Sequence, residues 1–150
     1  NHHDFLLNAI QKSKKSIFIV CPWITNAVVN NEMLELVRHK INADNKLAIC
    51  FGYRQTKYTL DQAEKIVEAD NFGDKKGHLE AINKLKDIIK ENLKYSPPIH
   101  TKALIIDEEF MLIGSHNWLS NSGSEKNTKD EISCIIDEKE MIDYVKRRYF

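Results

Sequence analysis

The stretch of sequence that decides the fold is HTKALIIDEEFMLIGSHN, which covers residues 100–117. It contains most of two expected strands, at residues 99–106 and 110–114, joined by three acidic residues. So short a polar connection predicts an antiparallel hairpin. His100 and Lys102 are two residues apart, so on an extended chain their side chains point to the same face. An imidazole beside an ammonium group is well suited to bind and attack a phosphate.

Apolar runs and amphipathic segments alternate on both sides of this stretch. Helices are expected at residues 4–15, at 33–41 after a cap at Asn26 or Asn30, and at 60–70, 79–93 and 138–150. Further strands are expected at residues 16–23, 46–53 and 131–136. The early β-α-β units predict a parallel core, and the hairpin adds antiparallel strands. The sequence therefore predicts an α/β fold, with a mixed β-sheet sandwiched between helices on both faces.

Length and composition favour one globular domain over residues 1–150, which could also be excised from a longer protein. The formal net charge is zero, which argues against a strongly basic coat for nucleic acid but leaves room for a local basic cleft. No apolar run approaches the roughly 20 residues that span a bilayer. The start lacks a signal peptide's apolar core. The three cysteines have no metal-ligand spacing and lie in expected strands, so we predict buried free thiols and a cytoplasmic location.

The hairpin stretch carries a specific pattern, His-x-Lys-x4-Asp-x6-Gly-Ser-x-Asn. Its fixed positions are His100, Lys102, Asp107, Gly114, Ser115 and Asn117. This pattern resembles the signature motif of the phospholipase D superfamily. The order of strands and helices also looks like one repeat of that fold, so the resemblance covers essentially the whole chain. It implies a phospholipase D-like α/β/α sandwich.

The resemblance implies a role for each catalytic position. His100 would be the nucleophile that attacks phosphorus and forms a phosphohistidine. Lys102 would bind the non-bridging oxygens and stabilise charge in the transition state. Ser115 and Asn117 would donate hydrogen bonds to the same oxygens. For the last two, the alternative is an ordinary turn with local hydrogen bonds.

The resemblance also implies one further catalytic residue, Glu131, and we expect Asp107 and Gly114 to support the site structurally. Glu131, at the start of the expected strand 131–136, would accept a hydrogen bond from a catalytic histidine, and Asp130 competes for this role. Asp107 lies five residues after Lys102, on the opposite side of an ideal strand, so we expect a structural role in holding the turn. Gly114 would allow the backbone turn that aims Ser115.

Possible substrate-binding residues follow the first two strands and flank the Gly-Ser turn. They are Trp23, Arg54, Lys57 and His116. The carboxyl ends of parallel strands are where ligands bind in open α/β sheets. The alternatives are a core or interface aromatic for Trp23 and solvated loop charges for Arg54 and Lys57.

The reaction implied by the family needs two histidines, one to attack and one to protonate the leaving oxygen. The chain carries one copy of the motif. We therefore predict either a homodimer with two His100 side chains facing one cleft, or a second phospholipase D-like half elsewhere in a longer protein. The mechanism requires no metal, and no cofactor is expected.

The leading functional prediction is a metal-independent phosphodiesterase acting on nucleic acid, an endonuclease that prefers DNA to RNA, with no membrane partner. One alternative is a phospholipase or phosphatidyl transferase, because the motif attacks a phosphodiester in either substrate. The other is a non-catalytic dimerisation or nucleic-acid-binding module of a larger protein. The intact motif argues against the last, since a binding module does not need a nucleophile beside a lysine.

Overall fold

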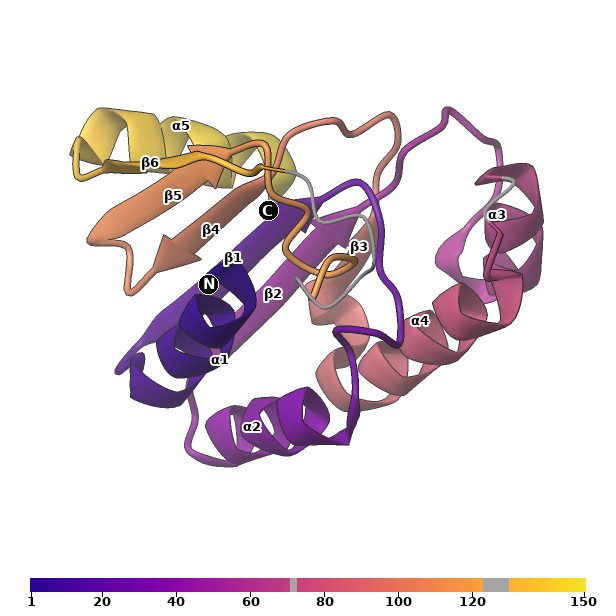
Figure 1. Ribbon diagram of the computed structural model, residues 1–150, viewed down its shortest axis with the longest axis horizontal. Coiled ribbons are helices and arrows are strands. Elements are labelled where there is room, and N and C mark those ends of the chain that lie inside the picture. Colours follow the sequence, from indigo (N-terminus) through magenta and orange to yellow (C-terminus); the bar gives the residue numbers. More distant parts are fainter. Residues whose placement is uncertain (71–72, 123–129) are drawn as a thin grey trace.

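The computed structural model describes residues 1–70, 73–122 and 130–150, and its centre is one mixed β-sheet (Figure 1). In this part of the chain the sheet has six strands in the order β3-β2-β1-β4-β5-β6. The strands are β1 (Ser16–Cys21), β2 (Lys46–Phe51), β3 (Leu93–Tyr95), β4 (Ala103–Ile106), β5 (Phe110–Gly114) and β6 (Ser133–Ile136). The first three are parallel to one another, and β4, β5 and β6 add antiparallel pairs. The predicted mixed sheet is confirmed.

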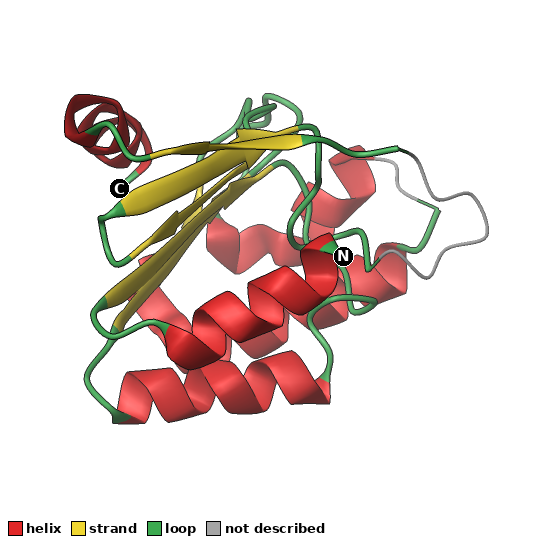
Figure 2. Cartoon of the chain, turned by 60° about the vertical axis from the view of Figure 1, so that its left-hand side comes forward, coloured by secondary structure: helices red, strands yellow, loops and turns green. Residues whose placement is uncertain are grey.

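Helices lie on both faces of the sheet (Figure 2). One face is covered by α1 (His2–Lys12), α2 (Asn31–Asn42), α3 (Ala63–Asp70) and α4 (Lys75–Ile89). Short 3-10 turns, η1 (Leu60–Gln62) and η2 (Lys90–Asn92), precede α3 and follow α4. The other face is covered by α5 (Lys139–Tyr149). The α/β sandwich predicted from the sequence is therefore confirmed.

The burial of the central strand β1 explains why its sequence is apolar without a break from Ile17 to Cys21. Ile17 and Ile19 are buried on the side of α1 to α4, and Phe18 and Val20 are buried on the side of α5. A strand with helices over both faces has no solvent-facing side, so the usual alternation of apolar and polar residues is lost.

Some helix boundaries differ from the predicted ones, because a capping residue or a short strand was not predicted. Asn30, not Asn26, caps α2, and its side-chain oxygen accepts a hydrogen bond from the Met33 amide at 3.1 Å. Helix α4 begins at Lys75 instead of residue 79, because Asp74 accepts a bond from the Gly77 amide at 2.9 Å. It ends at Ile89, and the chain then forms β3, a strand that we did not predict.

The three cysteines are free, but they are not all buried. Cys21 and Cys50 lie in the core strands, where burial raises the pKa of the Cys50 thiol to about 11 and that of Cys21 further. Cys134 is exposed, because β6 is the edge strand of the described sheet. The prediction of a buried thiol was wrong for Cys134. In the described ranges, no helix has both the length and the apolar character needed to cross a bilayer.

One edge of the sheet gathers the segments that carry the motif. Val20 near the end of β1 pairs with Ala103 at the start of β4, and Ala103 pairs with Ile113 near the end of β5. Gly114 pairs in turn with Ser133 at the start of β6. The residues just before β4, just after β5 and just before β6 therefore meet at this edge.

Candidate active site

His100 and Lys102 lie together immediately before β4. The Nζ atom of Lys102 is 3.3 Å from Nε2 of the His100 ring and 2.9 Å from the His100 carbonyl oxygen. The His100 side chain is exposed, whereas Lys102 is only 8% exposed. The ring is therefore open to an incoming substrate, and the ammonium group is held beside it in a partly dehydrated position.

Two opposing influences act on the pKa of the Lys102 ammonium group. Burial lowers the pKa of its ammonium group, and the Glu131 carboxylate opposes this shift by favouring the charged form. A cation with few competing waters interacts more strongly with an anion than a solvated one does. The position suits an anionic substrate such as a phosphodiester.

Ser115 follows β5 directly and is hydrogen-bonded to the segment just before β6. Its hydroxyl donates to the Glu131 carboxylate, and it accepts a bond from the Ile132 amide at 3.1 Å. The Ser115 amide donates to the Ile132 carbonyl at 3.0 Å. We expected Glu131 to accept from a histidine, but among the described residues no hydrogen bond joins it to His100. Asp130, the competing candidate, is exposed.

Gly114 matters for close packing and not, as we expected, for a turn. Its φ is not positive, unlike that of Gly52. A Cβ placed on Gly114 would lie 2.1 Å from the Ile132 carbonyl oxygen and 2.7 Å from the Ser133 Cα. Only glycine lets β5 and β6 approach closely enough for the bonds between Ser115 and Ile132.

Asn117 lies in the turn that follows, and its carbonyl accepts bonds from the amides of Ser120 and Asn121, both at 3.1 Å. These bonds close a compact turn after β5. The Asn117 side chain is half-buried at the sheet edge described above.

Asp107 lies at the far end of β4, away from His100. Its carboxylate accepts bonds from the amides of Lys14, Lys15 and Ser16 at 2.7–3.0 Å. Partial burial would raise the pKa of this carboxyl, but the amides of Ser16, Lys14 and Lys15 outweigh that and hold it below its usual range. Its φ of 53° is tolerated by Asp better than by most residues. These contacts support a structural role for Asp107.

The expected substrate-binding residues fall into two groups. Trp23, Arg54 and Lys57 follow β1 and β2 on the side of the site, with Trp23 half-buried and the two cations exposed. The guanidinium of Arg54 donates to the Ala69 carbonyl at 3.4 Å. His116 differs from expectation, because it is 3% exposed and lies edge-on to Trp118 at 5.1 Å. The structure places His116 in the interior, packed between His2 and Trp118 next to Ser115.

Three residues near the site were missed by sequence reasoning. Tyr53 follows β2, and its ring centroid is 6.2 Å from that of His100. Tyr149, on α5, shares a 2.7 Å hydrogen bond with Thr101, the residue between His100 and Lys102. His2 stacks on His116 with centroids 4.4 Å apart. Of these three, only Tyr53 could have been identified from the sequence, because it follows the carboxyl end of a parallel strand, where ligands bind.

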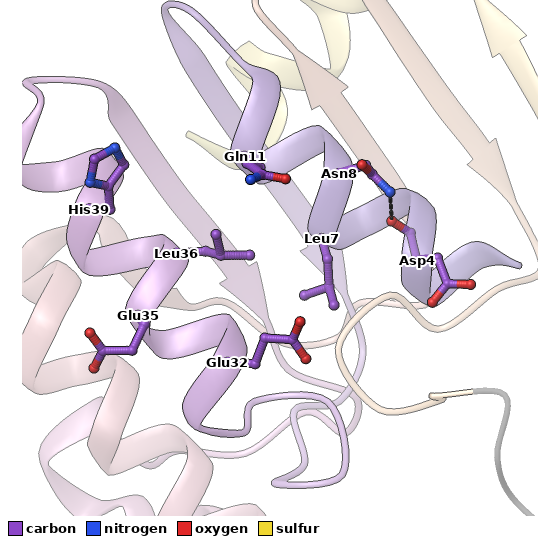
Figure 3. Close-up of a pocket in the computed structure, with 8 residues that line it drawn as sticks. All are labelled: Asp4, Leu7, Asn8, Gln11, Glu32, Glu35, Leu36 and His39. Atoms are coloured by element: carbon purple, nitrogen blue, oxygen red, sulfur yellow. Dashed lines mark hydrogen bonds between the residues drawn. The ribbon is translucent and has the colours of Figure 1, made fainter.

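Two cavities of the described part lie away from His100. One, of about 690 Å³, lies between α1 and α2, and Figure 3 shows its lining residues. Three of them are the carboxylates Asp4, Glu32 and Glu35, which disfavour a phosphodiester. The second, of about 470 Å³, lies between α1 and the β4–β5 hairpin, where Phe5, Ile106 and Phe110 line it.

The ranges that the structure describes contain no cluster of side chains suited to bind a metal ion. No group of three or more His, Cys, Asp or Glu side chains is placed there to hold an ion.

Comparisons with known proteins agree on the fold. None of the curated proteins matches the sequence. Among solved structures, NucT from Helicobacter pylori has a TM-score of 0.61 and 19% identity, covering 99% of this chain and 84% of that one. Nuc from Salmonella typhimurium, a phospholipase D family member, has a TM-score of 0.61 and 14% identity, covering 97% and 82%. The archaeal chromatin protein TrmBL2, described with a novel mode of DNA binding, has a TM-score of 0.50 and 12% identity, covering 99% and 46%.

The family comparison covers almost the whole chain. Residues 6–149 match the family model described as "Cardiolipin synthase, PLD-like domain". This match includes the His-x-Lys pair, the Gly-Ser turn and every strand described above. The chain therefore belongs to the phospholipase D superfamily.

Proposed function

We propose that this protein is a phosphodiesterase that cleaves nucleic acid through a phosphohistidine at His100. The observation that carries the proposal is the exposed His100 ring with the buried Lys102 ammonium group 3.3 Å from its Nε2 atom. A nucleophile open to solvent, beside a cation that can hold the attacked phosphate, is the arrangement that phosphoryl transfer needs.

The reaction proceeds in two steps. A neutral His100 ring attacks phosphorus, a P–N bond forms, and the bond from phosphorus to the leaving oxygen breaks while an acid protonates that oxygen. Water then attacks the phosphohistidine, the P–N bond breaks, and the former acid takes the proton from water. Lys102 stabilises the charge on the non-bridging oxygens in both steps, with Ser115 and Asn117 as hydrogen-bond donors.

The acid and base of these steps would be a second His100. Within the described part of the chain, neither a hydrogen bond nor a ring contact joins another histidine to His100. His78 and His116 are buried, and His39 lines the cavity between α1 and α2. A second copy of this chain, or a second half of a longer protein, would supply the missing ring.

Exposed apolar side chains on β6, on the segment just before it and on α5 favour such a pairing. Ile132 is 76% exposed directly after Glu131, and Ile135 on the edge strand β6 is 70% exposed. Met141 and Tyr144 on α5 are also exposed. Burying these side chains against a second copy would stabilise a dimer interface, and Glu131 would lie at its border because it precedes Ile132. We favour a homodimer.

Two observations favour nucleic acid as the substrate. The fold is shared with TrmBL2, described as a DNA-binding chromatin protein, and exposed cations, Arg54 and Lys57, follow β2 on the side of the site. We favour DNA over RNA and internal cleavage. The free cysteines favour a cytoplasmic location.

A phosphatidyl transferase is the second candidate. The description of the matching family model names cardiolipin synthase. The exposed side chains of Ile132 and Ile135 would face an acyl chain of such a substrate. The same His100 and Lys102 would serve this reaction, since the bond attacked is again a phosphodiester.

The test compares substrates in the presence of EDTA. The protein is incubated with labelled single- and double-stranded DNA and RNA, and separately with phosphatidylglycerol vesicles. We expect DNA cleavage that survives chelation and is abolished by His100→Ala, while the matched control His39→Ala, in a different part of the fold, retains it. An acid-labile, alkali-stable phosphoryl adduct on His100 would support the intermediate. Activity on the vesicles alone would select the transferase, and equal activity in His100→Ala would refute both candidates.

A further inference from the structure

Three aromatic rings follow one another at the sheet edge that carries His100. The Trp23 ring, after β1, lies 4.6 Å from the Tyr53 ring, after β2, at an interplanar angle of 51°. The Tyr53 ring lies 6.2 Å from the His100 ring at 47°. These distances are those of ring–ring contacts, so Tyr53 links Trp23 to the nucleophile. We call Trp23 and Tyr53 the aromatic step.

Gly52 explains why Tyr53 and His100 are neighbours. Its φ of 137° turns the chain at the end of β2, and a Cβ there would lie 2.9 Å from the Tyr95 ring and 3.0 Å from the Pro97 nitrogen. The segment that leads to His100 therefore runs directly against Gly52. Two backbone bonds fix this path, from the Ser96 amide to the Phe51 carbonyl and from the Ile99 amide to the Gly52 carbonyl.

The side of the aromatic step that faces away from His100 borders the core. Trp23 shares a small pocket with Phe51, Ile66 and Val67, all of which are buried. The half-buried Trp23 ring thus lies beside the core, and the half-buried Tyr53 ring packs against it. Rings held in this way lose little conformational freedom when a ligand packs on them.

We propose that the aromatic step binds the nucleobase adjacent to the scissile phosphate, and that the protein therefore acts on unpaired strands. This inference rests on the nuclease function proposed above. With the phosphate at His100 and Lys102, the neighbouring nucleotide falls beside Tyr53, where its base stacks on the phenol ring. A base in a duplex is covered by its stacked neighbours, so single-stranded nucleic acid is the substrate class that fits.

The positive charges next to the aromatic step also favour single-stranded nucleic acid as the substrate. Arg54 and Lys57 are exposed in the segment that follows Tyr53, and they would lie along the backbone of a strand whose base reaches the step. Stacking platforms joined to cations are typical of proteins that bind single strands without strong sequence preference. A planar base also matches the polar tip and apolar face of a tyrosine.

The experiment compares oligo(dT) with a strand of the same length and charge that carries abasic tetrahydrofuran residues in place of the bases. Tyr53→Leu should raise KM for oligo(dT) by roughly 5- to 100-fold and leave KM for the abasic strand unchanged. Tyr53→Phe keeps the ring and should retain most of the binding. Tyr58→Leu is the matched control, because the Tyr58 ring contacts Lys65 on α3. Annealing a complementary strand to oligo(dT) should protect it.

A binding measurement separates this inference from the nuclease proposal. Labelled oligo(dT) and the abasic strand are titrated with His100→Ala protein, with and without Tyr53→Leu, and followed by fluorescence anisotropy. If no substrate is cleaved but Tyr53 still favours oligo(dT), the aromatic step binds bases and the nuclease proposal fails. If His100-dependent cleavage occurs and Tyr53→Leu affects both strands equally or neither, the nuclease stands and the stacking inference is overturned. A protein that cleaves duplexes as fast as single strands would also overturn it.

Discussion

The ammonium nitrogen of Lys102 contacts His100 twice, at 2.9 Å from its carbonyl oxygen and 3.3 Å from its ring nitrogen Nε2. The same lysine that is proposed to hold the phosphate thus also fixes the backbone of the nucleophile. Because Lys102 is buried and His100 is exposed, the cation is positioned before the substrate arrives. Such preorganised charge is a large contributor to enzymatic rate enhancement.

The first prediction concerns alkaline pH. Burial lowers the pKa of Lys102, so activity should fall with rising pH below the usual lysine value, as the ammonium loses its proton. Glu131 acts in the opposite direction by favouring the charged form. Glu131→Gln should therefore move the alkaline limb of the kcat/KM profile to lower pH, while the amide oxygen can still accept from Ser115. Glu138→Gln, at the exposed start of α5, is the control. An alkaline limb that stays in place in Glu131→Gln would show that another group is responsible.

The second prediction concerns Tyr149, which holds the residue between the two catalytic side chains. Its hydroxyl shares a 2.7 Å bond with Thr101. Tyr149→Phe removes this bond at a cost of about 1 kcal/mol. We expect kcat to fall by roughly fivefold with little change in KM, because His100 and Lys102 lose their alignment but the binding surface remains. Thr101→Val should have the same effect, and the double variant should be no worse than either single one. Additive losses would mean that the two residues act separately.

The third prediction concerns Asp107 and acid stability. Its pKa is held below the usual range by three backbone amides despite partial burial, so its contribution is present above the unfolded-state pKa and is lost as pH falls through the folded value. Asp107→Asn should lower the free energy of unfolding by about 2 kcal/mol near neutral pH, measured in urea. The difference from the native protein should shrink in acid. Asp137→Asn, at an exposed position, is expected to change little. A difference that persists unchanged in acid would contradict this account.

The fourth prediction concerns the approach of β5 to β6. Gly114→Ala would place a methyl group 2.1 Å from the Ile132 carbonyl oxygen, so the strands must separate. We expect a loss of about 1–3 kcal/mol in stability and a larger proportional loss of activity, because Ser115 depends on its bonds to Ile132. Gly73→Ala is the matched control, since a Cβ there has no neighbour within 4 Å. Equal stability of the two variants would show that the edge strand shifts at no cost.

Five of the six described strands, and the motif, could be predicted from the sequence because each has a local signal. β1 is apolar from Ile17 to Cys21, and the hairpin of β4 and β5 is punctuated by three acidic residues. β3 could not be read, because Leu93-Lys94-Tyr95 is short and contains an exposed lysine. Its pairing depends on where the chain goes after α4, which is a tertiary property.

The details of the site depended on contacts between distant segments. His116 and Ser115 are adjacent in sequence, yet only Ser115 is exposed, since α1 brings His2 against the His116 ring. Tyr53 meets His100 because the segment before β4 passes along Gly52. Cys134 is exposed because β6 is an edge strand, and strand order cannot be read from the composition of one strand.

The last prediction tests whether two copies share one site. Native and His100→Ala chains are mixed, unfolded and refolded together so that subunits combine at random. If each site needs two His100 rings, only native–native dimers are active, and equal mixing should leave about one quarter of the activity of an all-native sample. Independent sites would leave about one half, and a monomer by light scattering with full activity would also contradict a shared site. Ile132→Lys together with Ile135→Lys should weaken the dimer, because both side chains are exposed in the single chain. The activity of that variant should then rise with protein concentration, as expected when the active species must assemble.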